Sequence, residues 1–352
     1  MDAPGAPLKM PSMRISIRNR AGLRSRVVLL AGVLLGCNLL VWLWALEALR
    51  QHALLLGTAL LAYGFGLRHA VDADHIAAID NVTRKLMQEG GRPVTVGLYF
   101  SLGHSTVVAV MTVLVVLGTG LMRHHFEDLQ VVGGLIGTTV SAVFLFAIAA
   151  VNVAVLADTW RRFHAVRSGT PACDRSDTRI GGGLMARLWR RAFRLVERSR
   201  QMYGIGLLFG LGFDTATEVG LLALSAAGAA KGLSPWAIMV LPALFSAGMA
   251  LIDTADSILM VGAYGWAFIT PVRKLYYNLS ITTLSVAVAV IVGGIETLGL
   301  IGRYLQPSGP LGRLTETLNS HFDALGFGIV GLFLGGWLVS FAIYRFKLYE
   351  TA

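Results

Sequence analysis

Residues Val27–Leu46 read VVLLAGVLLGCNLLVWLWAL, an apolar run in which Asn38 is the only strongly polar side chain. At about 1.5 Å per residue, a helix over this run is about 30 Å long, which matches the hydrocarbon core of a bilayer. The run is too long for a signal peptide, and no small-residue cleavage site follows it. We therefore interpret it as a retained first membrane span.

The rest of the chain repeats this apolar pattern. Of its 352 residues, 55% are hydrophobic and only 14% are charged, and the apolar residues are gathered into blocks. These blocks predict eight membrane-spanning helices. Their approximate ranges are 27–47, 53–80, 95–119, 131–158, 203–229, 235–263, 277–301 and 323–344. The expected fold is an all-α, polytopic membrane protein with a basic tail at 1–26 and one transmembrane transporter domain over 27–352.

The positive charge of the chain is unevenly distributed between the two ends of the spans. Lys and Arg outside the spans number 24 on one side, including the loop at 159–202, and five on the other. The positive-inside rule then places both termini and this loop in the cytoplasm. We therefore attribute the net charge of +10 to the membrane topology of the chain. The expected partner is the lipid bilayer, and no nucleic-acid partner is expected. Cys37 and Cys173 lie in different environments and predict no disulfide.

The second span carries ionisable groups that a bilayer disfavours, within Leu67–Ile76 (LRHAVDADHI). Insertion scales assign about 2.5–3.5 kcal/mol to each central Asp or Arg. Arg68, Asp72 and Asp74 together would therefore cost about 8–10 kcal/mol without ion pairs, water or a bound cation.

Helical spacing shows which of these groups can act together. At about 100° per residue, His69, Asp72 and His75 fall within an arc of about 120°. Asp74 points about 160° away from Asp72 on an ideal helix. Either Asp74 serves another helix, or the span is broken between Arg68 and His75, and we expect the break. Asp80 lies on the same face of the helix as His69, about three turns further along, where it could form a second cation-binding position closer to the cytoplasm.

Other spans supply matching side chains, and we expect His104 of the third span to complete the metal site. The further candidates are Asp214 and Glu218 in the fifth span and Asp253 and Asp256 in the sixth. Asp253 and Asp256 have two open interpretations. They either bind the ion, or they contact hydroxyl groups or Arg68 of neighbouring helices. Several carboxylates with three imidazoles suit Ni²⁺, Co²⁺ or Zn²⁺ better than Na⁺, K⁺ or Cu⁺.

Two short motifs recur and predict an inverted repeat of the second to fourth and the fifth to seventh spans. Phe65-Gly66-Leu67 matches Phe209-Gly210-Leu211, and Phe100-Ser101-Leu102-Gly103 matches Phe245-Ser246-Ala247-Gly248. This alignment places Asp74 opposite Glu218. Transporters often bind their cargo at the interface of such repeats.

Four stretches carry a resemblance to a known family. They are Arg68–Ile76, Leu102–Val108, Leu211–Val219 and Gly248–Ser257. With them the chain resembles the nickel/cobalt transporters, and most closely the high-affinity nickel permeases. The resemblance implies uptake of Ni²⁺, with Co²⁺ as a second candidate cargo, across a bacterial cytoplasmic membrane. It also implies supply of metalloenzymes such as hydrogenase or urease, and a central metal-handling role for His69, Asp74 and His75.

Other functional classes find less support in the sequence. A His-Glu-x-x-His zinc site is missing and the His residues are too few for a di-iron hydroxylase, so we expect no enzyme and no cofactor besides the cargo. The sequence contains no phosphate-binding loop, so ATP is not expected to drive transport. Uniport on the membrane potential is preferred, while proton coupling stays open. A divalent metal exporter or a membrane metal sensor is the alternative function.

Overall fold

The fold is given by a computed structural model of the chain. It describes residues 13–50, 55–117, 123–167, 196–212, 215–267 and 271–305, and the positions 313, 317, 326–329, 331–332 and 335. Within these ranges the regular structure is helical and no strand occurs, so the all-α prediction is confirmed. Residues 1–12 of the expected tail, and most of the basic loop and of the eighth span, lie outside the described residues, whereas residues 13–26 of the tail are helical.

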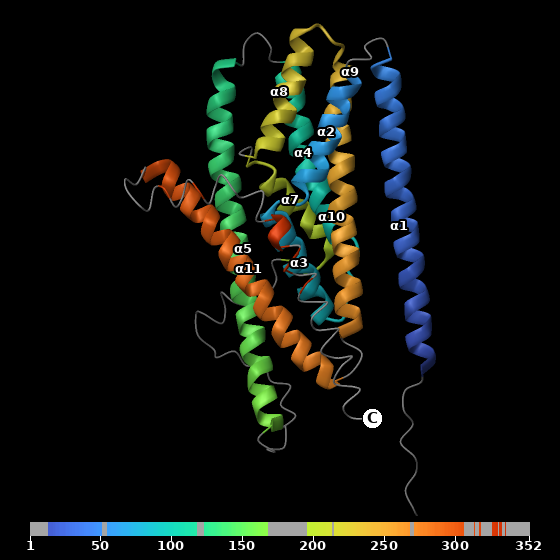
Figure 1. Ribbon diagram of the computed structural model, residues 1–352, viewed down its shortest axis with the longest axis vertical. Coiled ribbons are helices and arrows are strands. Elements are labelled where there is room, and N and C mark those ends of the chain that lie inside the picture. Colours follow the sequence, from blue (N-terminus) through green and yellow to red (C-terminus); the bar gives the residue numbers. More distant parts are fainter. Residues whose placement is uncertain are drawn as a thin grey trace, which may run out of the picture.

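The helices form an elongated bundle with α1 at its edge and α11 crossing it obliquely (Figure 1). The elements are α1 (Met13–Ala48), α2 (Leu56–His69), α3 (Ala73–Gln88), α4 (Val96–Leu117), α5 (Arg123–Arg167), η2 (Ser199–Gln201), α7 (Met202–Phe209), α8 (Ala216–Ala230), α9 (Pro235–Ile238), α10 (Val240–Ala267) and α11 (Pro271–Leu305).

Within the described part of the chain, five helical segments are long and apolar enough to cross a membrane. They are Gly22–Ala48, Val96–Leu117, Val131–Ala154, Pro235–Ala263 and Thr282–Gly302. The expected second and fifth spans are not among them, because each is divided into two shorter helices. The count of eight spans therefore stays a prediction.

Each divided span leaves the helical conformation for a few residues near the middle of the bundle. Asp72, with φ −63° and ψ 147°, precedes α3, and Thr215, with φ −84° and ψ 143°, precedes α8. These extended residues interrupt the backbone hydrogen bonding of a continuous helix. The break expected between Arg68 and His75 is thus present. Figure 1 shows α2 and α8 in the upper half and α3 and α7 lower down, so the two divided segments run in opposite directions.

Close backbone contacts join each divided span to a neighbouring long helix. A Cβ atom at Gly66 of α2 would overlap the backbone carbonyl of Phe245 in α10. A Cβ atom at Gly206 of α7 would likewise overlap the carbonyl of Phe100 in α4. Small residues allow helix backbones in membranes to approach in this way. The first half of each divided span is therefore packed directly against one partner helix.

These paired contacts support the predicted repeat but change its register. Tyr63–Leu67 (YGFGL) and Tyr203–Leu207 (YGIGL) occupy matching positions, so Gly66 corresponds to Gly206 rather than to Gly210. Since α3 begins after Asp72 and α8 after Thr215, His75 corresponds to Glu218. The segment that joins the two half-helices is three residues longer in the second copy. Aligning Phe65-Gly66-Leu67 with Phe209-Gly210-Leu211 therefore pairs the first half-helices in the wrong register. The repeat itself stays a prediction.

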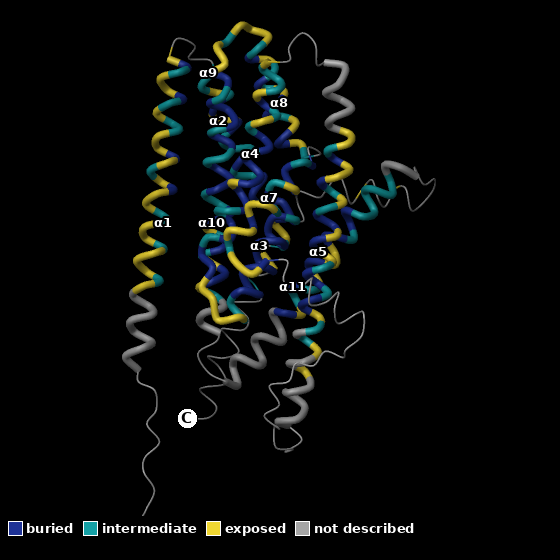
Figure 2. The backbone as a smooth tube through the Cα atoms, turned by 180° about the vertical axis from the view of Figure 1, so that it is seen from behind, coloured by how far each residue is buried: buried dark blue, intermediate teal, exposed yellow. Residues whose placement is uncertain are grey.

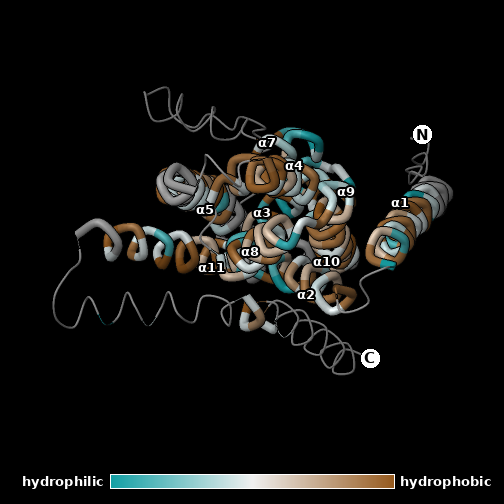
Figure 3. Tube along the Cα trace, turned by 90° about the horizontal axis from the view of Figure 1, so that it is seen from above, coloured by the Kyte–Doolittle hydropathy of each residue, from teal (hydrophilic) through white to brown (hydrophobic). Residues whose placement is uncertain are grey.

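Burial separates the centre of the bundle from its apolar outside. Dark blue segments in Figure 2 concentrate in α3, α4 and α10, whereas much of α1 is exposed. On α1, Val28 is 71% exposed and Leu29 is 69% exposed. Seen from above in Figure 3, α1, α5 and α11 lie at the outside of the bundle and contain hydrophobic segments. An apolar surface of this kind fits lipid contact.

Candidate metal centre

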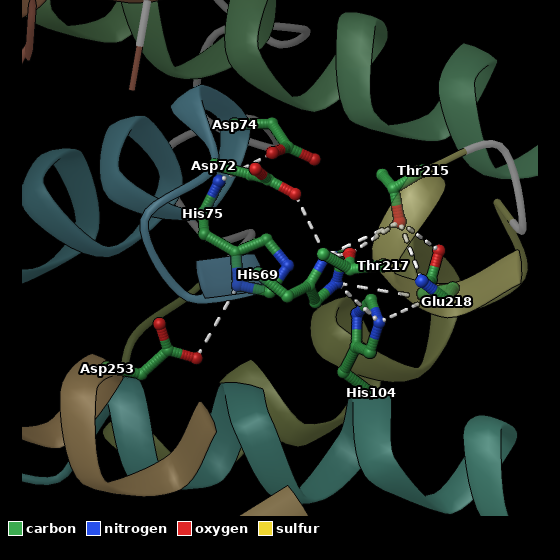
Figure 4. Close-up of polar contacts among 9 residues, drawn as sticks. All are labelled: His69, Asp72, Asp74, His75, His104, Thr215, Thr217, Glu218 and Asp253. Atoms are coloured by element: carbon green, nitrogen blue, oxygen red, sulfur yellow. Dashed lines mark hydrogen bonds and ion pairs between the residues drawn. The ribbon is translucent and has the colours of Figure 1, made fainter. Parts of the chain in front are cut away.

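Three histidines from three different helices meet at the break between α2 and α3. His69 ends α2, His75 lies in the first turn of α3, and His104 belongs to α4; each is at most 2% exposed. One ligand atom from each lies within 4.8 Å of those of the other two. The Nε2 atoms of His69 and His104 are 3.0 Å apart, and Figure 4 shows these two rings facing each other. The expected meeting of His104 with the second span is therefore observed.

The break is what brings His69 and His75 together. Six residues of a continuous α-helix rise by about 9 Å along the axis. In the structure the two ring centroids are only 4.6 Å apart, because the backbone turns at residues 70–72. The centroids of His75 and His104 are 5.1 Å apart. A continuous second span would not form this three-histidine cluster.

Glu218 adds a carboxylate from the other divided span. Its Oε1 lies 2.8 Å from His104 Nε2 and 3.9 Å from His69 Nε2, and the residue is 1% exposed. The hydroxyl of Thr215 donates to its other oxygen at 2.9 Å. Glu218 lies in the first turn of α8, where the positive end of the helix dipole stabilises a carboxylate.

The spacing of these atoms fits a metal ion. Two ligands at about 2.0–2.1 Å from an ion are separated by about 2.9–3.4 Å at bond angles between 90° and 110°. The His69–His104 and His104–Glu218 distances of 3.0 and 2.8 Å are close to that range. Imidazole nitrogen with carboxylate oxygen is a ligand set for Ni²⁺, Co²⁺ or Zn²⁺. Residues His69, His75, His104 and Glu218 are called the metal centre below.

The comparison with protein families matches residues 55–343 to the NicO model, described as high-affinity nickel-transport protein. This match spans most of the chain and includes the whole metal centre. The chain belongs to this family of nickel transporters.

Individual relatives of this NicO-family chain agree with that assignment. It is 53% identical to the high-affinity nickel transport protein of Cupriavidus necator, over 94% of each chain. It is 50% identical to the hydrogenase nickel incorporation protein HupN of Bradyrhizobium diazoefficiens, over 94% of this chain and 87% of that one. It is 41% identical to the cobalt transport protein NhlF of Rhodococcus rhodochrous, over 80% and 81%. No solved structure matches the chain.

Two aspartates at the break of the second span lie next to the histidines. Asp72 Oδ2 lies 2.9 Å from His69 Nδ1, on the opposite side of the ring from Nε2. Asp74 Oδ1 accepts the backbone N–H of His75 at 2.9 Å. Asp74 is thus engaged with the start of α3, and Figure 4 shows it on the far side of Asp72 from His104. Its central role in metal handling, implied by the resemblance, stays a prediction.

The remaining predicted site residues are distributed along α3 and α10. Asp253 lies 3.5 Å from His75 Nδ1 through its Oδ2 atom. Asp256 follows one turn later on α10, and its Oδ2 is buried without a hydrogen-bond partner among the described residues. Asp80 accepts a hydrogen bond from Ser285 of α11 at 2.7 Å rather than joining the histidine cluster. Asp214 lies outside the described residues.

Hydroxyl groups at the centre were missed by the sequence reasoning. Thr217 Oγ1 lies 3.2 Å from His69 Nδ1, and Ser101 Oγ lies 2.6 Å from Asp253 Oδ2. Both hydroxyls are buried beside ionisable groups in otherwise apolar helices. Their signal in the sequence is their position, since Thr217 precedes Glu218 and Ser101 lies one turn before His104.

Proposed function

We propose that this protein carries Ni²⁺ into the cell and that the ion binds at the metal centre on its way. The observation that supports this proposal is the meeting of three buried imidazoles with the Glu218 carboxylate where two divided spans approach each other. Cargo sites of transporters commonly lie where discontinuous helices meet. The C-terminal end of α2 at His69 also carries partial negative charge, which favours a cation.

The choice of cargo rests on ligand chemistry and on the relatives. The ligand set suits borderline divalent metals, and no thiolate lies at the centre among the residues that the structure describes. Two of the relatives above are named for nickel and one for cobalt, so we propose Ni²⁺ as the main cargo and Co²⁺ as the second. The name of the second relative supports supply of nickel to a metalloenzyme such as hydrogenase. The chain acts as a transporter and not as an enzyme.

Direction and driving force follow from charge. The excess of Lys and Arg outside the spans supports cytoplasmic termini in a bacterial inner membrane. An inside-negative potential favours inward movement of a dication by about 4.6 kcal/mol per 100 mV. We therefore propose uniport driven by the membrane potential.

The proposal is tested by uptake of radiolabelled nickel into intact cells that express each variant. His69→Ala, His75→Ala, His104→Ala and Glu218→Gln are expected to remove uptake, because each deletes one ligand. His164→Ala, in the last turns of α5 and outside the metal centre, is the matched histidine control and is expected to transport normally. Membrane content of every variant is measured by immunoblotting.

Competition with cobalt, zinc and magnesium in the same assay ranks the cargoes. Cobalt is expected to compete best and magnesium least, because magnesium prefers oxygen ligands and keeps its waters. Normal uptake by a correctly inserted His69→Ala/His104→Ala double variant would refute the site. Faster loss of preloaded nickel from expressing cells would instead identify an exporter.

A further inference from the structure

His75 is the histidine of the metal centre whose orientation the described contacts leave least determined. It is 1% exposed, and neither of its ring nitrogens has a hydrogen-bond partner among the described residues. Its ring packs edge-on against Phe100, with centroids 4.7 Å apart, which restrains the plane of the ring without engaging its nitrogens. A buried imidazole with two unpartnered nitrogens is costly unless both are used when cargo is bound.

Asp253 of α10 is placed to use one of those nitrogens. Its Oδ2 lies 3.5 Å from His75 Nδ1, and Figure 4 shows the carboxylate directed at that ring. Asp253 is fully buried, and its other oxygen has no partner among the described residues. With Nδ1–H directed at Asp253, the Nε2 atom of His75 remains available for the ion. His69 has the same arrangement, because Asp72 faces its Nδ1 at 2.9 Å.

Ser101 of α4 determines where the Asp253 carboxylate lies. Its hydroxyl is 2.6 Å from Asp253 Oδ2 and 2.9 Å from the backbone oxygen of Gly97. A hydroxyl carries one hydrogen, and the shorter contact to the charged acceptor is the stronger bond. Ser101 therefore donates to Asp253 from a fully buried position.

The backbones of α4 and α10 hold these two side chains in register. A Cβ atom at Gly97 would overlap the backbone carbonyl of Asp253. The backbone N–H of Gly97 donates to Ser257 Oγ at 2.7 Å. The separation of Ser101 from Asp253 is thus set by direct backbone contact between the two helices.

The geometry points to Ser101 and Asp253 as a positioning pair: Ser101 holds the Asp253 carboxylate, which accepts Nδ1–H of His75 and directs Nε2 at the transported ion. This inference rests on the proposed function, in which His75 is a ligand of Ni²⁺. Carboxylates that accept the second N–H of a metal-bound histidine fix its tautomer and ring orientation, and losing one typically weakens metal affinity about 10–100-fold.

The test is calorimetric nickel binding to the purified full-length protein, together with the KM and maximal rate of nickel uptake. Ser101→Ala is expected to raise both the nickel Kd and the KM about 10-fold, with a much smaller change in maximal rate. Ser225→Ala is the matched control, because Ser225 is also a fully buried serine and donates to the carbonyl of Leu221 on its own helix. That control is expected to bind and transport as the wild type does, and thermal unfolding of both variants confirms intact packing.

A double variant separates positioning from unrelated damage. If Ser101 acts through Asp253, adding Ser101→Ala to Asp253→Asn raises the nickel Kd no further. A wild-type Kd in Ser101→Ala, or effects that multiply in the double variant, would overturn the pair. Loss of nickel binding in Asp253→Asn as complete as in His75→Ala would make Asp253 a direct ligand and also overturn it.

His75→Ala keeps this test distinct from that of the proposed function. If the His75→Ala variant binds nickel as the wild type does, the assignment of the metal centre itself is refuted. If His75→Ala loses nickel binding while Ser101→Ala behaves as the wild type does, the metal centre is supported and only the role of the Ser101–Asp253 pair is refuted.

Discussion

Replacing Gly66 by alanine tests how closely α2 must pack against α10 for the metal centre to form. A Cβ atom at Gly66 would lie 2.7 Å from the carbonyl carbon of Phe245, whereas ordinary contacts begin at 3.4 Å. The two backbones must therefore separate by at least about 0.7 Å, which exceeds the tolerance of about 0.5 Å typical of functional sites. His69 lies one turn further along α2 and moves with it.

Gly66→Ala is expected to lower stability only moderately and yet to reduce transport strongly. Overpacking typically costs about 1–3 kcal/mol, and alanine recovers about 0.8–1.0 kcal/mol over glycine through helix propensity. The net destabilisation of Gly66→Ala is thus at most about 2 kcal/mol. A misplacement of about 1 Å can nevertheless lower a rate about 100-fold, so nickel uptake is expected to fall by more than 10-fold.

The chain supplies matched controls for this prediction. Gly64 lies on the same helix, and a Cβ atom there would meet nothing within 4 Å, so Gly64→Ala is expected to transport normally. The second divided span offers the same pair, with Gly206→Ala as the damaging change and Gly204→Ala as its control. Nickel uptake and thermal unfolding in detergent are measured for all four. Wild-type uptake by Gly66→Ala, or equal damage from Gly64→Ala, would refute the reasoning.

Three further predictions concern the carboxylates, a buried cation and the topology. Glu218→Gln is expected to reduce nickel uptake more than Asp74→Asn, because Glu218 faces the histidine cluster while Asp74 accepts a backbone N–H; equal uptake by the two variants would contradict this. Arg84→Leu is expected to lower stability by about 1–3 kcal/mol in thermal unfolding, because Asn81 on α3 and Thr282 on α11 each lose the hydrogen bond that this buried guanidinium donates. In a Cys37→Ala background, an impermeant thiol reagent is expected to label Cys173 in inverted vesicles and not in intact cells. Labelling from outside would reverse the assigned orientation.

Much of the fold class could be predicted from the sequence because a bilayer restricts what a chain can do within it. Apolar runs such as Val27–Leu46 can satisfy their backbone groups in lipid only as helices or closed barrels, and their length selects the helix. The cost of placing Arg68, Asp72 and Asp74 among apolar residues marked the second span as functional. The contradictory direction of Asp74 on an ideal helix also indicated the break, which the structure confirms at residues 70–72.

The candidate site could be predicted in its residue types but not in its contacts. Helical periodicity places His69 and His75 on one face of their own span, but it does not say which other helices approach that face. The register expected for the predicted repeat also differs from the observed packing, for a related reason. Matching letters aligned Gly66 with Gly210, while the close approach of α2 to α10 and of α7 to α4 pairs Gly66 with Gly206.

The sequence by itself therefore determined a helical membrane protein with candidate imidazole and carboxylate ligands in a broken second span, because the low polarity of the bilayer leaves few alternatives for such residues. Only the tertiary structure decided that His104 faces His69, that Glu218 rather than Asp74 lies beside their Nε2 atoms, and that Asp253 faces His75. These contacts join residues between 35 and 178 positions apart in the chain. They depend on how closely glycine lets the helices approach, a property of pairs of helices that no single helix contains.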